Sequence, residues 1–127
     1  MAKSEQNKDR FRDIAEKYNS KELKSQLVEE LINLLKDKTR YPDDQQLRNQ
    51  ASLTNMEEDL ILERSSPFVC SPKVVFGTRT HSIVLVDYDG NCEFIEKTMK
   101  TPINPDKVEW ETNSFSFPFT PGNELKC

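Results

Sequence analysis

Residues 83–97 constrain the fold of this chain more than any other stretch. Ile83–Val86 is an unbroken run of β-branched and aliphatic residues, which is typical of a strand with both faces covered. Asp89-Gly90 is the residue pair that suits a two-residue type I′ turn, and residues 92–97 then return as a second strand. The sequence therefore predicts a hairpin whose first strand lies in the middle of a sheet.

A later apolar run, residues 108–117, also indicates a sheet with cover on two sides. Its large apolar residues change phase along the run: Val108 and Trp110 are even, whereas Phe115, Phe117 and the following Phe119 are odd. A strand buried on one face needs a bulge near residues 112–114 to accommodate this change, but a strand covered on both faces does not.

The first 40 residues predict two helices. An apolar stripe at spacings of three and four marks the first: Phe11, Ile14, Ala15 and Tyr18. The second is expected to begin at Ser20 as its N-cap and to continue to Lys38. It carries a longer stripe of the same spacing: Leu23, Leu27, Val28, Leu31, Leu34 and Leu35. Both stripes are typical of helices that cover a core.

Residues 41–66 read as a polar connector. Pro42 ends the helical part, and Thr54 with Glu57 has the form of a capping box for a short helix through Leu60 or Leu62. Residues 67–119 form the sheet part and 120–127 a tail. The predicted class is α+β, with two helices followed by an antiparallel sheet in one incomplete domain over residues 1–127.

Composition excludes several classes of function. The net charge is -4 with no basic run, so nucleic acid is not an expected partner. No apolar stretch approaches the length of a membrane span, and the N-terminus lacks the apolar core of a signal peptide. The cysteines, Cys70, Cys92 and Cys127, form no Cys-x-x-Cys pair, and His81 is the single histidine. We therefore expect a cytoplasmic protein without a metal site of its own.

Several short segments, in order and spacing, resemble the C-terminal part of a known family. They are Phe76-Gly77-Thr78-Arg79-Thr80, Ile83–Asp87, Asp89-Gly90, Phe94, Glu96–Met99 and Trp110–Thr112. The family is that of transport and Golgi organization protein 2, named also for an N-terminal Asn-Arg-Asp-Glu motif. The resemblance implies an N-terminal nucleophile hydrolase-like fold with four αββα layers. This layering would explain a sheet that needs cover on two faces.

The chain departs from the family at its start, where Ala2 follows Met1 and the Asn-Arg-Asp-Glu motif is absent. In that class the base is the α-amino group of the nucleophilic residue itself, so Cys70 or Cys92 cannot substitute. We expect a non-catalytic fragment or short isoform that needs the missing N-terminal half or a protein partner. Two alternatives stay open: the C-terminal half of a thiol-dependent amide hydrolase, and a module that binds proteins through its sheet edge.

The resemblance also implies a cellular role in Golgi organisation and protein secretion, with lipid homeostasis and heme transport as further expectations. The chain would then be cytoplasmic and associated with the Golgi apparatus or mitochondria. Heme would be a cargo, and no resident cofactor is expected.

Candidate ligand-binding residues are Arg79 and His81, within or beside the family motif Gly77, Thr78, Arg79 and Thr80. The forked donors of Arg79 could hold a carboxylate or a heme propionate, or else anchor the start of the strand. A neutral imidazole at His81 could be an axial heme ligand, although a lone histidine beside a strand is more often a surface residue or one that begins the strand. No catalytic residue is expected.

Overall fold

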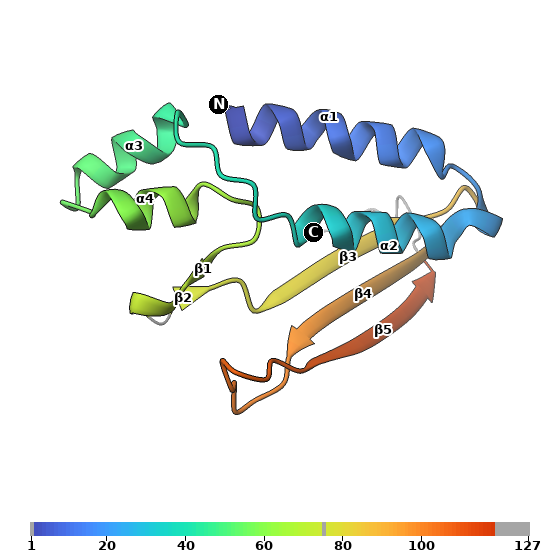
Figure 1. Ribbon diagram of the computed structural model, residues 1–127. Helices are drawn as coiled ribbons and strands as arrows, with labels where there is room; N and C mark the ends of the chain where they lie inside the picture. Colours follow the sequence, from blue (N-terminus) through green and yellow to red (C-terminus); the bar gives the residue numbers. More distant parts are fainter. Residues whose placement is uncertain (1, 75, 119–127) are drawn as a thin grey trace, which may run out of the picture. The chain divides into compact units, whose positions relative to one another are not determined.

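The computed structural model describes residues 2–74 and 76–118, and the chain divides into two compact units, Met1–Thr78 and Arg79–Cys127. The first unit holds the helices and a two-stranded sheet. The second is a three-stranded antiparallel sheet (Figure 1). The predicted α+β class, with helices before antiparallel strands, is confirmed. Phe119, the tail 120–127 and Cys127 lie outside the described residues.

Helix α1, Ala2–Lys17, is longer than the apolar stripe predicted. Before Phe11 it has no large apolar residue, and the helix continues there on residues of good intrinsic propensity such as Ala, Glu, Gln and Lys. Along the stripe, Ile14, Ala15 and Tyr18 are half-buried, whereas Phe11 is exposed. Periodicity located the packed end of the helix but could not detect its polar beginning.

The second helical segment begins with a 3₁₀ turn, η1 (Lys21–Leu23), and continues as α2, Lys24–Leu35. Ser20 precedes this turn in an extended conformation, and its side chain makes no capping hydrogen bond. The prediction that the Ser20 side chain caps this helical segment is therefore wrong. The buried residues of α2 are Leu31, Ile32 and Leu34, so the predicted stripe does pack against a core.

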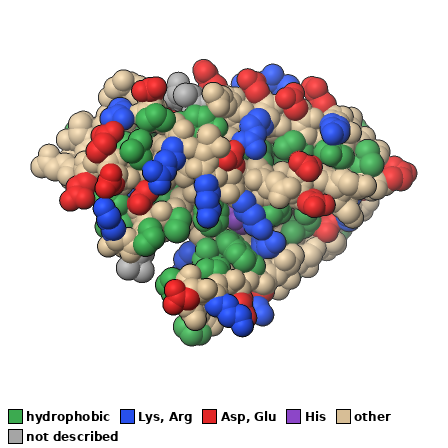
Figure 2. Space-filling view, in the orientation of Figure 1, with side chains coloured by type: hydrophobic (Ala, Val, Ile, Leu, Met, Phe, Trp, Pro, Cys, Tyr) green, Lys and Arg blue, Asp and Glu red, His purple; other side chains and the backbone are tan. Residues whose placement is uncertain are grey.

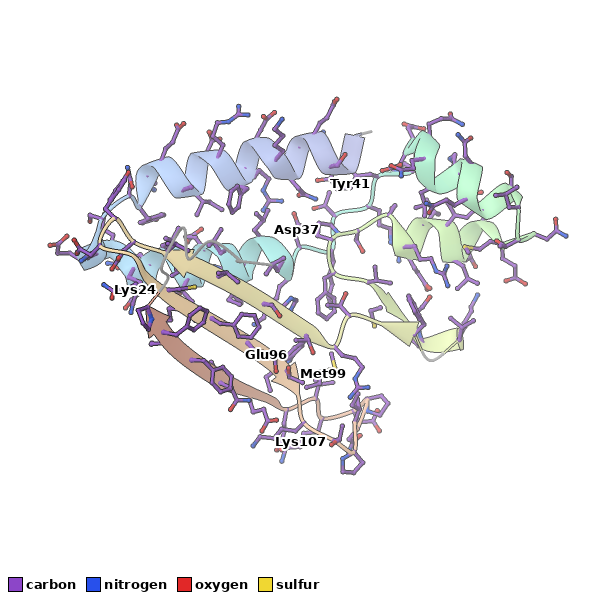
Figure 3. All side chains as sticks on the ribbon, turned by 180° about the vertical axis from the view of Figure 1, so that it is seen from behind. Lys24, Asp37, Tyr41, Glu96, Met99 and Lys107 are labelled. Atoms are coloured by element: carbon purple, nitrogen blue, oxygen red, sulfur yellow. The ribbon has the colours of Figure 1, made fainter. Side chains whose placement is uncertain are left out.

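Asp37 lies just past the end of α2 (Figure 3) and binds two parts of the first unit. Its Oδ1 accepts hydrogen bonds from the Thr39 hydroxyl at 2.6 Å and the Thr39 N–H at 2.8 Å, and its Oδ2 pairs with Arg10 of α1. Hydrogen bonds from the Thr39 hydroxyl and then from the Thr39 N–H lower the pKa of Asp37 most from its ordinary value of 3.8. Burial opposes them, and Arg10 lowers the pKa further through smaller contributions.

This lowered pKa predicts an acid-dependent loss of stability. Between the folded pKa of Asp37 and 3.8, the unfolded chain binds more protons, so the free energy of unfolding rises with pH there. The stabilisation is present above that window and is lost as pH falls through the folded pKa. In urea titrations between pH 2 and pH 6, Asp37→Asn should lose less stability on acidification than the wild type. The exposed Asp13→Asn variant is the control, and identical acid profiles for wild type and Asp37→Asn would contradict the prediction.

The segment expected to be a connector contains two helices, α3 (Gln45–Ser52) and α4 (Glu58–Arg64). Helix α3 is not predicted by the apolar pattern, although Asp44 supplies its N-cap: the carboxylate accepts a hydrogen bond from Leu47 N–H at 3.1 Å. Asp44 follows Pro42 and Asp43, a sequence that is equally typical of a turn. Since Asp favours both turns and N-caps, composition alone did not separate the two roles.

Helix α4 confirms a short helix that includes Leu60 and Leu62, but it begins at Glu58, later than a capping box at Thr54 predicts, and the capping box is wrong. The Thr54 hydroxyl donates backward to the Ala51 carbonyl at 3.2 Å, and Glu57 precedes α4 without a side-chain capping bond. At the other end of α4, Ser65 is fully buried; its hydroxyl accepts from Tyr41 N–H at 2.8 Å and donates to the Leu62 carbonyl at 2.7 Å. Ser65 thus supplies the hydrogen-bond acceptor for the backbone N–H of Tyr41.

Strand β1 (Cys70–Ser71) pairs antiparallel with β2 (Phe76–Gly77), with Cys70 opposite Gly77. The 3₁₀ turn η2 (Pro72–Val74) stands between them. Strand β1 ends at Ser71, because the ring of Pro72 cannot continue the pairing.

The second unit contains β3 (Thr80–Val86), β4 (Asn91–Met99) and β5 (Trp110–Pro118) in the order β3-β4-β5. The expectation that Ile83–Val86 lies in the middle is wrong for this sheet, because β4 is the strand with two neighbours (Figure 1). An apolar run indicates that both faces of a strand can be buried. It does not indicate whether the strand has a hydrogen-bonded neighbour on each of its two edges.

Strand β5 pairs with β4 in one continuous register, from Asn91 opposite Pro118 to Met99 opposite Trp110. The ladder has no bulge. The phase change along residues 108–117 thus places Trp110 on one face of the sheet and Phe115 on the other, as expected of a strand suited to cover on both faces.

The β3–β4 turn differs from the two-residue type I′ turn predicted. Asp87 and Asn91 close a three-residue loop, with Asp87 N–H donating to the Asn91 carbonyl at 3.0 Å. The Asp87 carboxylate accepts from Asp89 N–H and from Asn91 N–H, each at 2.9 Å. Within this loop, positive φ occurs at Gly90 alone, at 82°, whereas type I′ requires two such residues. The carboxylate of Asp87 thus stabilises the longer loop.

Candidate functional site

The first half of the family motif, Gly77-Thr78, joins the two strands of the small sheet. Thr78 N–H donates to the Val69 carbonyl at 2.9 Å, and Val69 N–H donates to the Thr78 hydroxyl at 3.1 Å. A Cβ at Gly77 would lie 2.7 Å from the Val69 carbonyl oxygen, closer than atoms approach without a shift of the backbone. These two residues have a clear structural role.

The second half of the motif begins β3. The Arg79 carbonyl accepts from Met99 N–H at 2.9 Å, while its side chain is exposed. No described residue forms a hydrogen bond or ion pair with its guanidinium. The Thr80 hydroxyl lies 3.1 Å from that of Thr98 on β4. The backbone of Arg79 therefore anchors the strand, and its charged group is available to an anionic ligand.

His81 is buried, with 3% of its surface exposed, and its ring stacks on Trp110 of β5 at a centroid distance of 5.2 Å and an interplanar angle of 17°. An axial heme ligand would need this stack to open. Because Arg79 and His81 are two residues apart in extended chain, they lie on the same face of the sheet. Ligand binding by these residues remains a prediction.

Lys97 is a candidate that the sequence analysis missed. It lies directly opposite His81 in the β3–β4 ladder, where cross-strand side chains are neighbours. The face that bears Arg79 therefore has a second cation near His81. The correct register of the hairpin would have identified Lys97 as the neighbour of His81. The two-residue turn predicted from Asp89-Gly90 instead gives a register that is wrong by one residue.

The other face of the same sheet carries a continuous apolar surface, here called the apolar face: Val84, Val86, Phe94, Phe115 and Phe117. Ladder pairing sets Val84, Phe94 and Phe115 side by side across three strands. The rings of Phe94 and Phe115 lie 6.4 Å apart.

Most of the apolar face is open to solvent. Exposed fractions are 59% for Val84, 55% for Val86, 60% for Phe115 and 48% for Phe117. Large apolar residues at these values on neighbouring strands form a patch of a kind that monomeric proteins rarely expose. Among the described residues, this side of the sheet is therefore largely exposed.

The described thiols lie in different settings. Cys92 is 4% exposed and stands between Val86 and Phe117 in the ladder, whereas Cys70 is exposed on β1. Among the described residues, no group of three or more His, Cys, Asp or Glu side chains could hold a metal ion. The helices within the described ranges also include none that is long and apolar enough to cross a membrane.

Two hollows lie away from the motif. One of about 280 Å³ is formed by the β4–β5 loop, including Lys100 and Lys107, and one of about 490 Å³ by the α3–α4 loop with Lys73. Neither is lined by Arg79 or His81. The face drawn in Figure 2 carries both acidic and basic side chains.

Comparisons with known proteins agree with the resemblance seen in the motif. A family model described as Transport and Golgi organisation 2 matches residues 1–101. Transport and Golgi organization protein 2 of Drosophila melanogaster is 35% identical over 96 residues, which cover 76% of this chain and 31% of the relative. The Mus musculus homolog is 41% identical over 49 residues, covering 39% of this chain and 17% of the relative.

The match reaches into both compact units, so it includes the helices as well as the Gly77–Thr80 motif and the β3–β4 hairpin. It spans about a third of the Drosophila relative and less of the mouse one. By the extent of the family match and the similarity to these relatives, the chain belongs to the Transport and Golgi organisation 2 family.

Proposed function

We propose that this chain is a non-catalytic part of a transport and Golgi organization protein, acting in Golgi organisation and protein secretion by binding a second structural layer through its apolar face. The observation that carries the proposal is the exposure of Val84, Val86, Phe115 and Phe117 on one side of the β3-β4-β5 sheet. Aromatic and branched side chains at such positions contribute strongly to binding when they are buried.

The occupant of the apolar face is proposed to be the rest of the family fold. The resemblance to N-terminal nucleophile hydrolases implies a second sheet packed on this one, and the match spans no more than about a third of the relatives. Strand alternation places Glu96 and Glu111 on the same side as the apolar face, toward its other end. The second sheet should therefore present an apolar centre flanked by Lys or Arg.

A non-catalytic role is supported by the settings of the described thiols. Cys92 is buried and stands between Val86 and Phe117 in the ladder, so its sulfur is not accessible to a substrate. Cys70 stands on a short strand opposite Gly77, which offers no side chain to act as a base.

The proposal extends to location and cargo. The chain would act at the cytoplasmic side of Golgi or mitochondrial membranes, in lipid or heme handling. The face that bears Arg79, His81 and Lys97 would contact the carboxylates of such a cargo, because guanidinium and ammonium groups are the usual partners of propionates.

The test is reconstitution in cells that lack their own family member. The chain is expressed together with a separate N-terminal portion of the Drosophila relative, and secretion of a reporter and Golgi morphology are measured. We expect recovery with both pieces and none with Val84→Ser/Phe115→Ser in this chain. Recovery that is equally strong with the variant would overturn the proposed role of the apolar face.

A matched control addresses catalysis. The N-terminal portion is used a second time with alanine in place of the residue after its initiator methionine, the position at which the resemblance to N-terminal nucleophile hydrolases implies a nucleophilic cysteine. Unchanged recovery supports the non-catalytic role. Loss of recovery, with complex formation intact, would show that the assembled protein acts as a thiol-dependent hydrolase.

A further inference from the structure

Asp89-Gly90, in the loop between β3 and β4, is the only place in the sequence where an Asp or Asn precedes glycine. Because glycine has no side chain, the backbone nitrogen that follows Asp89 is not shielded by a Cβ. This nitrogen can attack the side-chain carboxyl carbon of Asp89, which closes a succinimide ring and releases water. Addition of water then opens the ring to Asp or to isoaspartate, in which the main chain runs through the former side chain. The two steps need no cofactor and no oxidant.

The folded loop opposes this reaction at the attacking nitrogen. Gly90 N–H donates to the Asp87 carbonyl at 3.1 Å, and the nitrogen must leave this hydrogen bond to reach the carboxyl carbon. The Asp87 carboxylate also accepts from Asp89 N–H and Asn91 N–H, each at 2.9 Å, and from the Asn91 side-chain amide at 3.0 Å. Asp87 therefore holds the chain on both sides of the peptide bond that would react.

We propose that Asp89 is a site of isoaspartate formation and that the Asp87 carboxylate controls its rate. In the folded chain the reaction proceeds when the 87–91 loop opens transiently, and such local opening is rarer the more hydrogen bonds must break. Hydrogen bonds to an ionised carboxylate are about twice as strong as those between neutral groups. Loss of this carboxylate should therefore speed isoaspartate formation by about tenfold or more.

Isoaspartate at position 89 would alter the end of the hairpin. It adds one carbon–carbon bond of about 1.5 Å to the main chain of the loop. The Asp87 N–H and the Asn91 carbonyl, 3.0 Å apart, close the loop only at its present length. The β3–β4 ladder would then loosen at its last pair, Val86 opposite Cys92. This inference goes beyond the proposed function and does not depend on it, because it concerns only the chemistry of the loop.

Ageing the whole chain in buffer at neutral pH tests the proposal. Isoaspartate is located by mass spectrometry of peptides, and it is quantified by methyl transfer from S-adenosylmethionine with protein L-isoaspartyl methyltransferase. In the native wild type it should accumulate slowly at residue 89 and not at Asp106, which is exposed but precedes Lys107. In the urea-unfolded wild type, where the loop bonds are absent, formation at residue 89 should be at least about tenfold faster.

Two variants of the guarding residue separate its carboxylate from the fold as a whole. Asp87→Ala should form isoaspartate at residue 89 about tenfold faster than the native wild type, with native circular dichroism. Asp87→Asn retains a carbonyl oxygen that can accept from the backbone, so its rate should lie between the two. Gly77→Ala is the control for a general loss of stability, because it strains a different sheet and should keep the wild-type rate.

Several outcomes would overturn the inference. One is an unfolded chain that forms no isoaspartate at residue 89, since the site would then be unreactive. Another is a native wild type that reacts as fast as the unfolded chain, because the loop would then give no protection. Equal rates for the wild type and both Asp87 variants, or equal acceleration by Gly77→Ala and Asp87→Ala, would remove the proposed role of the Asp87 carboxylate.

Discussion

Gly77→Ala is expected to lower the free energy of unfolding by about 2 kcal/mol, the usual scale for forcing an extra group into a packed site. The added Cβ would lie 2.7 Å from the Val69 carbonyl oxygen and 3.4 Å from the Cα of Cys70. Both are backbone atoms, so no side chain can rotate away to relieve the contact. The two strands must move apart instead, and this weakens the Thr78–Val69 hydrogen bonds.

Urea or guanidinium titration followed by circular dichroism measures this effect. Thr78→Ser is the matched control, because it leaves a hydroxyl to accept from Val69 N–H and should cost much less than Gly77→Ala. Equal stability of Gly77→Ala and the wild type would contradict this prediction. It would show that β1 and β2 can move apart at little cost and that the close approach to Val69 does not require glycine at position 77.

Val84→Ser/Phe115→Ser is expected to abolish binding to the N-terminal portion of the family fold while changing the stability of this chain little. Both side chains are more than half exposed, so the chain loses little buried area when they are truncated. In a complex they would lie near the centre of the interface, where removing an aromatic anchor costs about 2 kcal/mol or more. Together the two changes should raise the dissociation constant by at least about 100-fold.

Isothermal titration calorimetry with the separately expressed N-terminal portion gives the affinity, and chemical denaturation gives the stability. Binding of a hydrophobic dye to the chain alone should also fall in the double variant. Thr112→Ser, on the opposite face of β5, is the control and should bind like the wild type. Undiminished binding by the double variant would place the interface elsewhere on the chain.

The sequence predicted the helices that carry a regular apolar stripe, and it did not predict the helix that consists mostly of polar residues. The stripe that includes Leu31 and Leu34 correctly located α2, because burial of that face is what stabilises the helix. Helix α3 was missed because it is mostly polar and begins at Asp44, a residue equally suited to a turn. Its existence depends on packing beside α4, which a local pattern does not contain.

The candidate site was only partly visible in the sequence. Arg79 and His81 were identified from the motif, but the stacking of His81 on Trp110 and the position of Lys97 opposite His81 depend on strand pairing. Gly77 and Thr78 are also motif residues, and their bonds to Val69 show a role in joining strands. A motif identifies which residues belong together in a family without separating those that bind from those that pack.

The sequence by itself determined the α+β class, the approximate positions of β3, β4 and β5, and the two-sided apolar character of their sheet, since each follows from residues close together in the chain. The tertiary structure decided which apolar residues share a face. A two-residue turn would have set Ile83 opposite Glu96, but the loop stabilised by the Asp87 carboxylate sets it opposite Ile95. A shift of one residue moves every side chain of a strand to the other face, so register alone assembles Val84, Phe94 and Phe115 into one exposed surface.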